Sequence, residues 1–145
     1  MKKKIALVFG LLIILVCGCT VEPKEDTEAK ELQLKRETYI SNLGVTTDDK
    51  VVIKYKNGKD EECYYIFFIK GKTYTQKQIT LHRNEDSYKS AVRDYETSLY
   101  YQLIKNDEVM STEITLKKDY NVGDKKVKSV IENKYKDDDK FEIIK

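Results

Sequence analysis

Residues 51–69 read VVIKYKNGKDEECYYIFFI, and they contain the strongest fold signal in the chain. Residues 51–56 lead into Asn57-Gly58, a pair that favours the two-residue turn of a β-hairpin because both turn residues accept positive φ. Residues 63–69 are apolar on both faces of the expected strand. This pattern is typical of a central strand that is covered on both sides. The stretch therefore predicts a hairpin whose second strand lies inside a sheet.

The alternation of side chains along this strand predicts which of them share a face. The expected sets are Tyr64, Ile66 and Phe68 on one face and Cys63, Tyr65 and Phe67 on the other, with at least one set under helices. A two-residue turn would also place Lys54 opposite Glu61, a favourable pair of charges across the strands.

The segments after the hairpin alternate between strand and helix patterns. Gly71 leads into a more polar strand, 73–81, which we expect nearer the edge of the sheet. The next expected elements are a helix at 84–95 capped by Asn84 or Asp86, a hairpin of strands 98–105 and 109–117, a short helix at 125–133 and a closing strand at 141–144. This order predicts an α+β fold: a mostly antiparallel β-sheet of about six strands with two to three helices packed on one face.

A helical pattern also precedes the hairpin. Leu32, Tyr39, Ile40 and Leu43 recur at near-helical spacing over 28–43, with Arg36 on the same face. So thin an apolar stripe fits either a docked helix or a charged stalk, and we expect docking. Residues 20–27 are polar and contain the only proline, so we interpret 19–27 as a tether and 28–145 as a single domain.

The N-terminus has the layout of an export signal. Three lysines, 2–4, precede an apolar run, 5–16, that is interrupted by Gly10 and followed by Gly18-Cys19. The run spans twelve positions, whereas a membrane-spanning helix needs about 20 apolar residues. The segment resembles a bacterial lipoprotein signal, which implies cleavage after residue 18 and a diacylglyceryl group on Cys19. Two acyl chains, such as palmitate, give a stable anchor. We therefore expect lipidation at Cys19 and attachment to the outer face of the cell membrane.

The charge balance argues against a nucleic-acid partner. The 145 residues include 27 basic and 25 acidic side chains, and removal of 1–18 takes three lysines away. The processed chain then has 24 basic and 25 acidic residues, mixed along its length. A nucleic-acid-binding protein usually carries a basic patch instead.

Few residues point to catalysis. His82 is the only histidine, and we expect it to be solvated or in a turn because no local motif supplies a partner. Cys63 has no intramolecular partner if Cys19 carries lipid, and it is expected in the core. Asp137-Asp138-Asp139 lacks the alternating ligand spacing of a calcium loop and is interpreted as a solvated turn.

The sequence also lacks a Gly-rich phosphate loop, a Cys-x-x-Cys pair and a Gly-x-Ser-x-Gly turn. We therefore expect a protein that is not an enzyme, with no catalytic residues, no metal site and no cofactor.

Tyrosine is abundant, with eleven copies and no tryptophan. Tyrosine is enriched at interfaces, but it is also a favoured strand residue. Tyr64-Tyr65 and Tyr100-Tyr101 each place one ring on each face of their strands. These four residues are the candidate binding face, and core or sheet-surface packing is the competing interpretation.

Several short strings resemble the YehR-like lipoproteins, a bacterial family without an assigned biochemical role. They are the signal ending at Cys19, Asn57-Gly58 followed by a strand, Lys70-Gly71-Lys72-Thr73 leading to Gln76-Lys77-Gln78, and the closing FEIIK. The resemblance covers about residues 51–145. Because that family has no known catalytic residues, the resemblance assigns no chemical role to any residue of this chain.

The sequence thus predicts a small lipid-anchored protein of the cell envelope that acts as a non-enzymatic binding module for an unidentified protein or small ligand. The alternative is an immunity or superinfection-exclusion lipoprotein that protects the membrane from a peptide toxin or phage.

Overall fold

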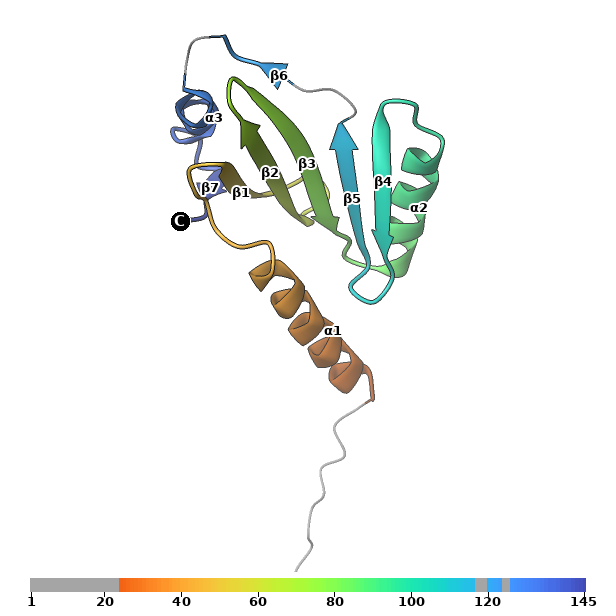
Figure 1. Ribbon diagram of the computed structural model, residues 1–145. Helices are drawn as coiled ribbons and strands as arrows, with labels where there is room; N and C mark the ends of the chain where they lie inside the picture. Colours follow the sequence, from red (N-terminus) through yellow and green to blue (C-terminus); the bar gives the residue numbers. More distant parts are fainter. Residues whose placement is uncertain (1–23, 117–119, 124–125) are drawn as a thin grey trace, which may run out of the picture.

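The computed structural model describes residues 24–116, 120–123 and 126–145, which form three helices and seven strands (Figure 1). The helices are α1 (Lys24–Ser41), α2 (Glu85–Glu96) and α3 (Val127–Tyr135). The strands are β1 (Lys50–Lys56), β2 (Glu62–Lys70), β3 (Thr73–Leu81), β4 (Tyr101–Asn106), β5 (Ser111–Leu116), β6 (Tyr120–Asn121) and β7 (Phe141–Ile143). The α+β class predicted from the sequence is confirmed.

All strand pairs in the sheet are antiparallel, and the strand order is β4-β5-β3-β2-β1-β7, with β6 paired to β3. The prediction that 63–69 is central is confirmed, since β2 lies between β1 and β3. The prediction that 73–81 lies near the edge is wrong, because β3 pairs with β2 on one side and with β5 on the other. Its polar character has another cause: Lys77 of β3 forms an ion pair with Glu113 of β5 on the sheet surface.

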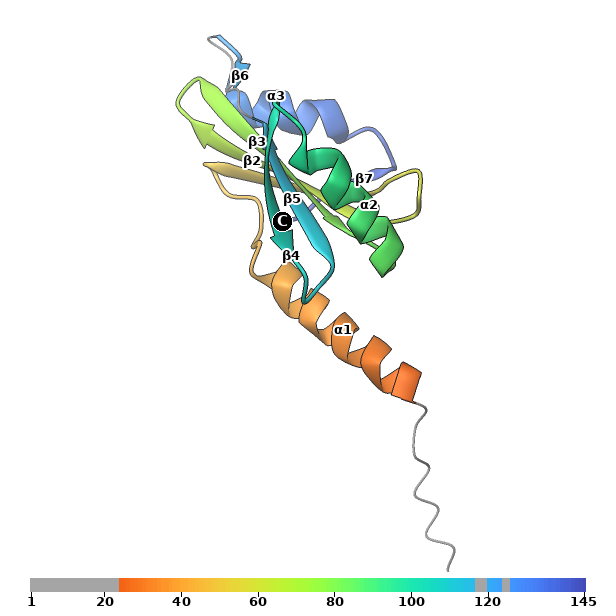
Figure 2. The same cartoon turned by 90° about the vertical axis from the view of Figure 1, so that its right-hand side faces the viewer.

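The two faces of β2 belong to different hydrophobic clusters, as the alternation predicts. On one face Phe67 packs with Val51 and Ile53 against α3. On the other face Tyr64 and Ile66 pack with residues of β1, β3 and α1. Figure 2 shows α2 and α3 on the same side of the sheet. Two helices therefore share one face, and α1 covers part of the opposite face.

The turn between β1 and β2 differs from the predicted two-residue turn. Lys56 pairs with Glu62, and the Asn57 amide N–H donates to the Glu61 carbonyl oxygen at 3.1 Å. The loop is therefore 58–60, and the residue with positive φ is Asp60 (φ 60°). In this register Lys54 lies opposite Tyr64, and its ion pair is with Glu62 at 2.9 Å. The predicted pairing of Lys54 with Glu61 is wrong.

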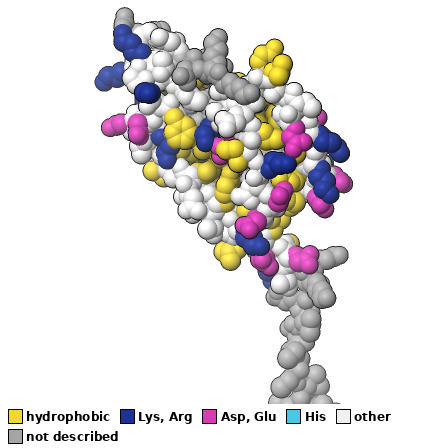
Figure 3. Space-filling view, turned by 45° about the vertical axis from the view of Figure 1, so that its right-hand side comes forward, with side chains coloured by type: hydrophobic (Ala, Val, Ile, Leu, Met, Phe, Trp, Pro, Cys, Tyr) yellow, Lys and Arg dark blue, Asp and Glu magenta, His cyan; other side chains and the backbone are white. Residues whose placement is uncertain are grey.

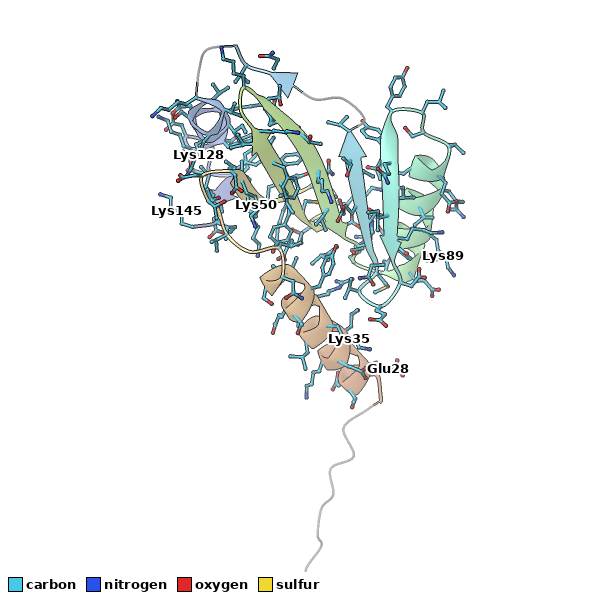
Figure 4. All side chains as sticks on the ribbon, in the orientation of Figure 1. Glu28, Lys35, Lys50, Lys89, Lys128 and Lys145 are labelled. Atoms are coloured by element: carbon cyan, nitrogen blue, oxygen red, sulfur yellow. The ribbon has the colours of Figure 1, made fainter. Side chains whose placement is uncertain are left out.

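Helix α1 begins at Lys24, so residues 24–27 of the predicted tether are helical. Figure 1 shows its N-terminal part projecting away from the sheet. The C-terminal part docks, because Tyr39, Ile40 and Leu43 are partly buried against the sheet. Lys50, labelled in Figure 4, reinforces this end by donating from Nζ to the Leu43 carbonyl oxygen at 2.8 Å.

The N-terminus of α2 follows the sequence prediction. Asn84 is the N-cap, and its side-chain oxygen accepts the Ser87 amide N–H at 2.9 Å. A cap of this kind satisfies one of the amide groups that lack a partner within the helix. It also fixes the start of α2 a few residues after β3, where Ser87 of α2 reaches Glu61.

Candidate functional site

A pocket of about 610 Å³ opens between α1 and the end of the sheet where β1 turns into β2. Eight of its thirteen lining residues are charged. They are the cations Arg36, Lys54, Lys56 and Arg83 and the acids Glu37, Asp60, Glu61 and Glu62. Because the two signs are equal in number, the lining as a whole is formally neutral. Figure 3 likewise shows both signs of charge interspersed with hydrophobic side chains over one face of the molecule.

Arg36 connects the α1 wall of the pocket to the sheet. Its Nε donates to the Val109 carbonyl oxygen at 3.0 Å, and its Nη2 donates to the His82 carbonyl oxygen. Burial lowers the pKa of this guanidinium from its usual value, while Glu62 and Glu61 oppose the shift. Arginine has no useful neutral form in proteins, so the group stays charged. Its two hydrogen bonds hold α1 at a fixed place against the sheet.

The hairpin wall consists of paired charges. Lys54 contacts Glu62 at 2.9 Å, and Lys56 contacts Asp60 at 2.8 Å. The Tyr64 hydroxyl donates to Glu62 at 2.6 Å. Burial and this carboxylate both raise the pKa of the Tyr64 phenol, so it remains a neutral donor. The hairpin wall thus presents two lysines that are already neutralised by neighbouring carboxylates.

Glu61 is a buried carboxylate at the base of the hairpin, with 3% of its surface exposed. Its Oε1 accepts hydrogen bonds from the Ser87 hydroxyl and, at 3.4 Å, from the Arg83 amide N–H. Its Oε2 accepts one from Asn57 Nδ2 at 2.9 Å. Burial alone would raise the pKa of Glu61, but the bonds from Ser87 and Asn57, together with His82, outweigh it and lower the pKa to about 2. The group is therefore charged at neutral pH.

His82 is buried beside this carboxylate, so the prediction of a solvated or turn histidine is wrong. Only 3% of the residue is exposed. Its Nδ1 lies 3.3 Å from Glu61 Oε1, and its Nε2 lies 2.8 Å from Thr112 Oγ1. Burial lowers the pKa of His82 although Glu61 opposes the shift, so the ring is neutral. The charged Glu61 then selects the tautomer with the proton on Nδ1, and Nε2 accepts from the Thr112 hydroxyl.

The series Glu61, His82 and Thr112 has the donor order of an acid–histidine–hydroxyl catalytic group. However, Thr112 is 1% exposed and His82 is 3% exposed, and neither lines the pocket described above. A nucleophile must be able to approach its substrate within contact distance. In this conformation the series joins the residue before β2 and the residue after β3 to Thr112 of β5, which is a structural role.

The pH dependence of stability provides a test of this buried cluster. Because the pKa of Glu61 falls from 4.5 to about 2 on folding, its contribution is fully present above pH 4.5 and is lost as the pH falls toward 2. The linked free energy is about 3 kcal/mol. The lowered pKa of His82 acts in the same direction, with stability lost as the pH falls below its unfolded value of 6.5. We expect urea unfolding of the Glu61→Gln variant to show a markedly flatter pH profile between pH 4.5 and 3 than wild type. Parallel profiles would contradict the assignment.

Cys63 and the aspartate run occupy the positions expected of them. Cys63 is fully buried, its Sγ lies 3.7 Å from Thr80 Oγ1, and burial raises the pKa of its thiol. The prediction of a core cysteine is confirmed. Residues 137–139 lie in the exposed turn between α3 and β7. Among the residues that the structure describes, no group of three or more His, Cys, Asp or Glu side chains is placed to hold a metal ion.

The first tyrosine pair of the candidate binding face is largely buried. Tyr64 is 3% exposed and is one of the residues that line the pocket. Tyr65 is on the opposite face of β2, where its ring stacks on Tyr55 with centroids 4.6 Å apart. The two residues therefore serve different parts of the core.

The second pair lies at the far edge of the sheet. Tyr100 is 77% exposed, whereas Tyr101 packs its ring edge-on against Tyr95 of α2 at 5.9 Å. The four tyrosines therefore do not share one surface. Tyr64 alone among them belongs to the pocket.

Sequence reasoning missed the pocket because its charged residues are far apart in the chain. Arg36 was placed on the docking face of its helix, but its acceptors, at 82 and 109, could not be identified from local patterns. Glu61 was predicted to form a cross-strand charge pair with Lys54, and not to contact His82, Ser87 and Asn57. One signal was available in the sequence. Glu61 lies two residues before Cys63, so in an extended chain its side chain points to the same side as that of Cys63, which was expected in the core.

Searches of protein-family models, curated proteins and solved structures find no match for this chain. The predicted signal and Cys19 lie outside the described residues. Within the described part of the chain, no helix is long and apolar enough to cross a membrane.

Proposed function

We propose that this protein is a lipid-anchored binding module of the bacterial cell envelope, attached through acyl chains on Cys19, without enzymatic activity. The observation that carries the proposal is the signal-like segment that ends in Gly18-Cys19. A diacylated cysteine would keep the domain at the outer face of the membrane. The resemblance to YehR-like lipoproteins is consistent with this proposal.

The pocket between α1 and the sheet is the proposed binding site. A volume of about 610 Å³ is within the usual range for small-ligand sites, about 300–1,000 Å³. Helix α1 supplies one wall and begins five residues after Cys19. The segment that would carry the anchor thus leads directly into the element that forms the site.

An immunity or superinfection-exclusion role is the alternative proposal. The same anchor supports it, because a domain held at the outer face of the membrane is placed where a peptide toxin or phage attacks. Deletion of the gene would then make cells sensitive to such an agent. Unchanged sensitivity to the toxins and phages of that host would contradict this role.

Replacing Cys19 tests the anchor directly. We expect Cys19→Ser to abolish lipid attachment and to leave the signal uncleaved by the lipoprotein pathway. Mass spectrometry of the native protein should find an acylated N-terminal cysteine in wild type and none in the variant. The matched control is Cys17→Ser, which removes a thiol from the leader and should leave lipidation unchanged. An unmodified Cys19 in the wild-type protein would overturn the proposal.

A further inference from the structure

The charges of the pocket do not all neutralise one another locally. The two lysines on the hairpin wall are each within 3 Å of a carboxylate. In contrast, no carboxylate lies within ion-pair distance of Arg36 or Arg83 among the described residues, and the side chain of Arg83 makes no hydrogen bond there. Among the acidic residues of the pocket, Glu37 accepts a hydrogen bond from the neutral Gln33 at 2.9 Å and has no cation partner in the described chain.

Glu62 and Glu61 favour the charged form of Arg36 from a distance, but Glu61 forms no ion pair with Arg36 or Arg83. Its oxygens are occupied by Ser87, Asn57, His82 and the Arg83 amide N–H. The carboxylate is also 3% exposed, so a ligand cannot reach it without displacing those donors. The groups left for a ligand are two guanidinium ions and one carboxylate around one pocket: Arg36 and Glu37 on α1, and Arg83 between β3 and α2.

The side chain of Arg36 is held in a fixed position with one nitrogen left to bind an anion. It uses Nε and Nη2 for the carbonyl oxygens of residues 109 and 82, and Nη1 has no partner in the described chain. A side chain that is already fixed loses little conformational entropy when a ligand arrives. Guanidinium groups bind carboxylates with charge-assisted hydrogen bonds, which are stronger than those between neutral groups.

We propose that this pocket binds a zwitterionic ligand, an amino acid or a short peptide with free termini. Its carboxylate is bound by Arg36 and Arg83, and its ammonium group is bound by Glu37. The apolar lining residues Ile40 and Leu81 contact the aliphatic part of the ligand. This inference rests on the proposed function only in taking the pocket as the binding site, and it does not depend on the lipid anchor.

The pocket couples binding to the position of α1. One wall belongs to the helix and the other to the sheet, so the complete site exists only when α1 is docked. A ligand that contacts both walls stabilises the docked state by mass action. Amide hydrogen exchange in 33–41 should therefore slow when ligand is added.

The experiment is isothermal titration calorimetry on the purified full-length protein in detergent. The probes are alanine, trialanine with free ends, its C-terminal amide and its N-terminally acetylated form. We expect saturable binding of trialanine or alanine, and at least tenfold weaker binding of the amide. Arg83→Gln should weaken binding at least tenfold, and because this residue is exposed we expect the melting temperature to stay that of wild type. Arg93→Gln, an exposed arginine of α2 outside the pocket, is the matched control and should bind as wild type does.

Saturable binding of either alanine or trialanine supports the zwitterionic site. Tighter binding of alanine indicates an amino-acid ligand, and tighter binding of trialanine indicates a short peptide. No saturable heat with either probe at millimolar concentration would overturn it. Equal affinity for the amide, or wild-type affinity in Arg83→Gln with an unchanged melting temperature, would also overturn it. Lipidation of Cys19 is measured separately by mass spectrometry. A negative binding result would therefore not contradict the lipid anchor, and an unlipidated protein would not contradict the ligand site.

Discussion

Glu61→Ala should lower the free energy of unfolding by about 3–5 kcal/mol, because each buried donor left without an acceptor costs about 1–3 kcal/mol. The substitution leaves the Ser87 hydroxyl, the Asn57 amide, His82 Nδ1 and the Arg83 amide N–H without their common acceptor. Each of these donors then lacks its protein acceptor in the folded state. Urea unfolding at pH 7, followed by circular dichroism, measures the loss.

Two variants make the result specific. Glu61→Gln keeps the shape and one acceptor oxygen, so we expect an intermediate loss of about 1–3 kcal/mol. Glu62→Ala, at the next position, removes a carboxylate whose ion pair with Lys54 is about one-third exposed and which also accepts the Tyr64 hydroxyl, so it should cost about 1–2 kcal/mol. If Glu61→Ala were as mild as Glu62→Ala, the buried carboxylate would not be an organising centre of this end of the sheet.

The parts of the fold that sequence could predict are those set by local period. Alternation along 63–68 assigns each side chain to a face, whatever strand lies beside it. It therefore remained correct although the register with β1 was predicted wrongly. The central position of β2 follows for the same reason, because a strand that is apolar on both faces needs cover on both faces.

The parts that sequence could not predict depend on contacts between distant residues. The turn after β1 is decided by Asn57, whose side-chain oxygen accepts the amide N–H groups of Lys59 and Glu61 at 2.9 and 3.0 Å. These bonds favour a three-residue loop over the two-residue turn that Asn-Gly usually indicates. The register is thereby shifted by three positions, so that Lys54 pairs with Tyr64 instead of Glu61, and the buried Glu61 contacts His82, twenty-one positions away.

The placement of α1 is non-local for a similar reason. Its apolar stripe is thin, and its strongest anchor is Arg36, whose acceptor on Val109 is 73 residues away. No periodicity in 24–41 indicates which face of the sheet that arginine reaches. The candidate site combines this arginine, whose helix face was predicted correctly, with Glu61, whose partners were not.

Two adjacent phenylalanines provide the sharpest test of the sheet itself. Phe67→Ala should destabilise the fold by about 3–5 kcal/mol, because removing a buried ring loses its transfer energy and leaves a cavity. Phe67 is 2% exposed, and its ring lies 5.6 Å from that of Tyr74 and 5.9 Å from that of Tyr135. Urea unfolding at pH 7 gives the difference from wild type.

Phe68→Ala is the matched control, since it removes the same ring one position along the same strand. Phe68 is 41% exposed on the opposite face, where Lys77 Nζ lies 5.6 Å from its ring centroid. Deleting it removes a surface cation–π contact and little buried area, so the expected loss is about 1 kcal/mol or less. A slip of β2 by one residue would exchange the two environments and reverse the order of these effects. Equal losses would contradict the assignment of these two side chains to a buried and a partly exposed face.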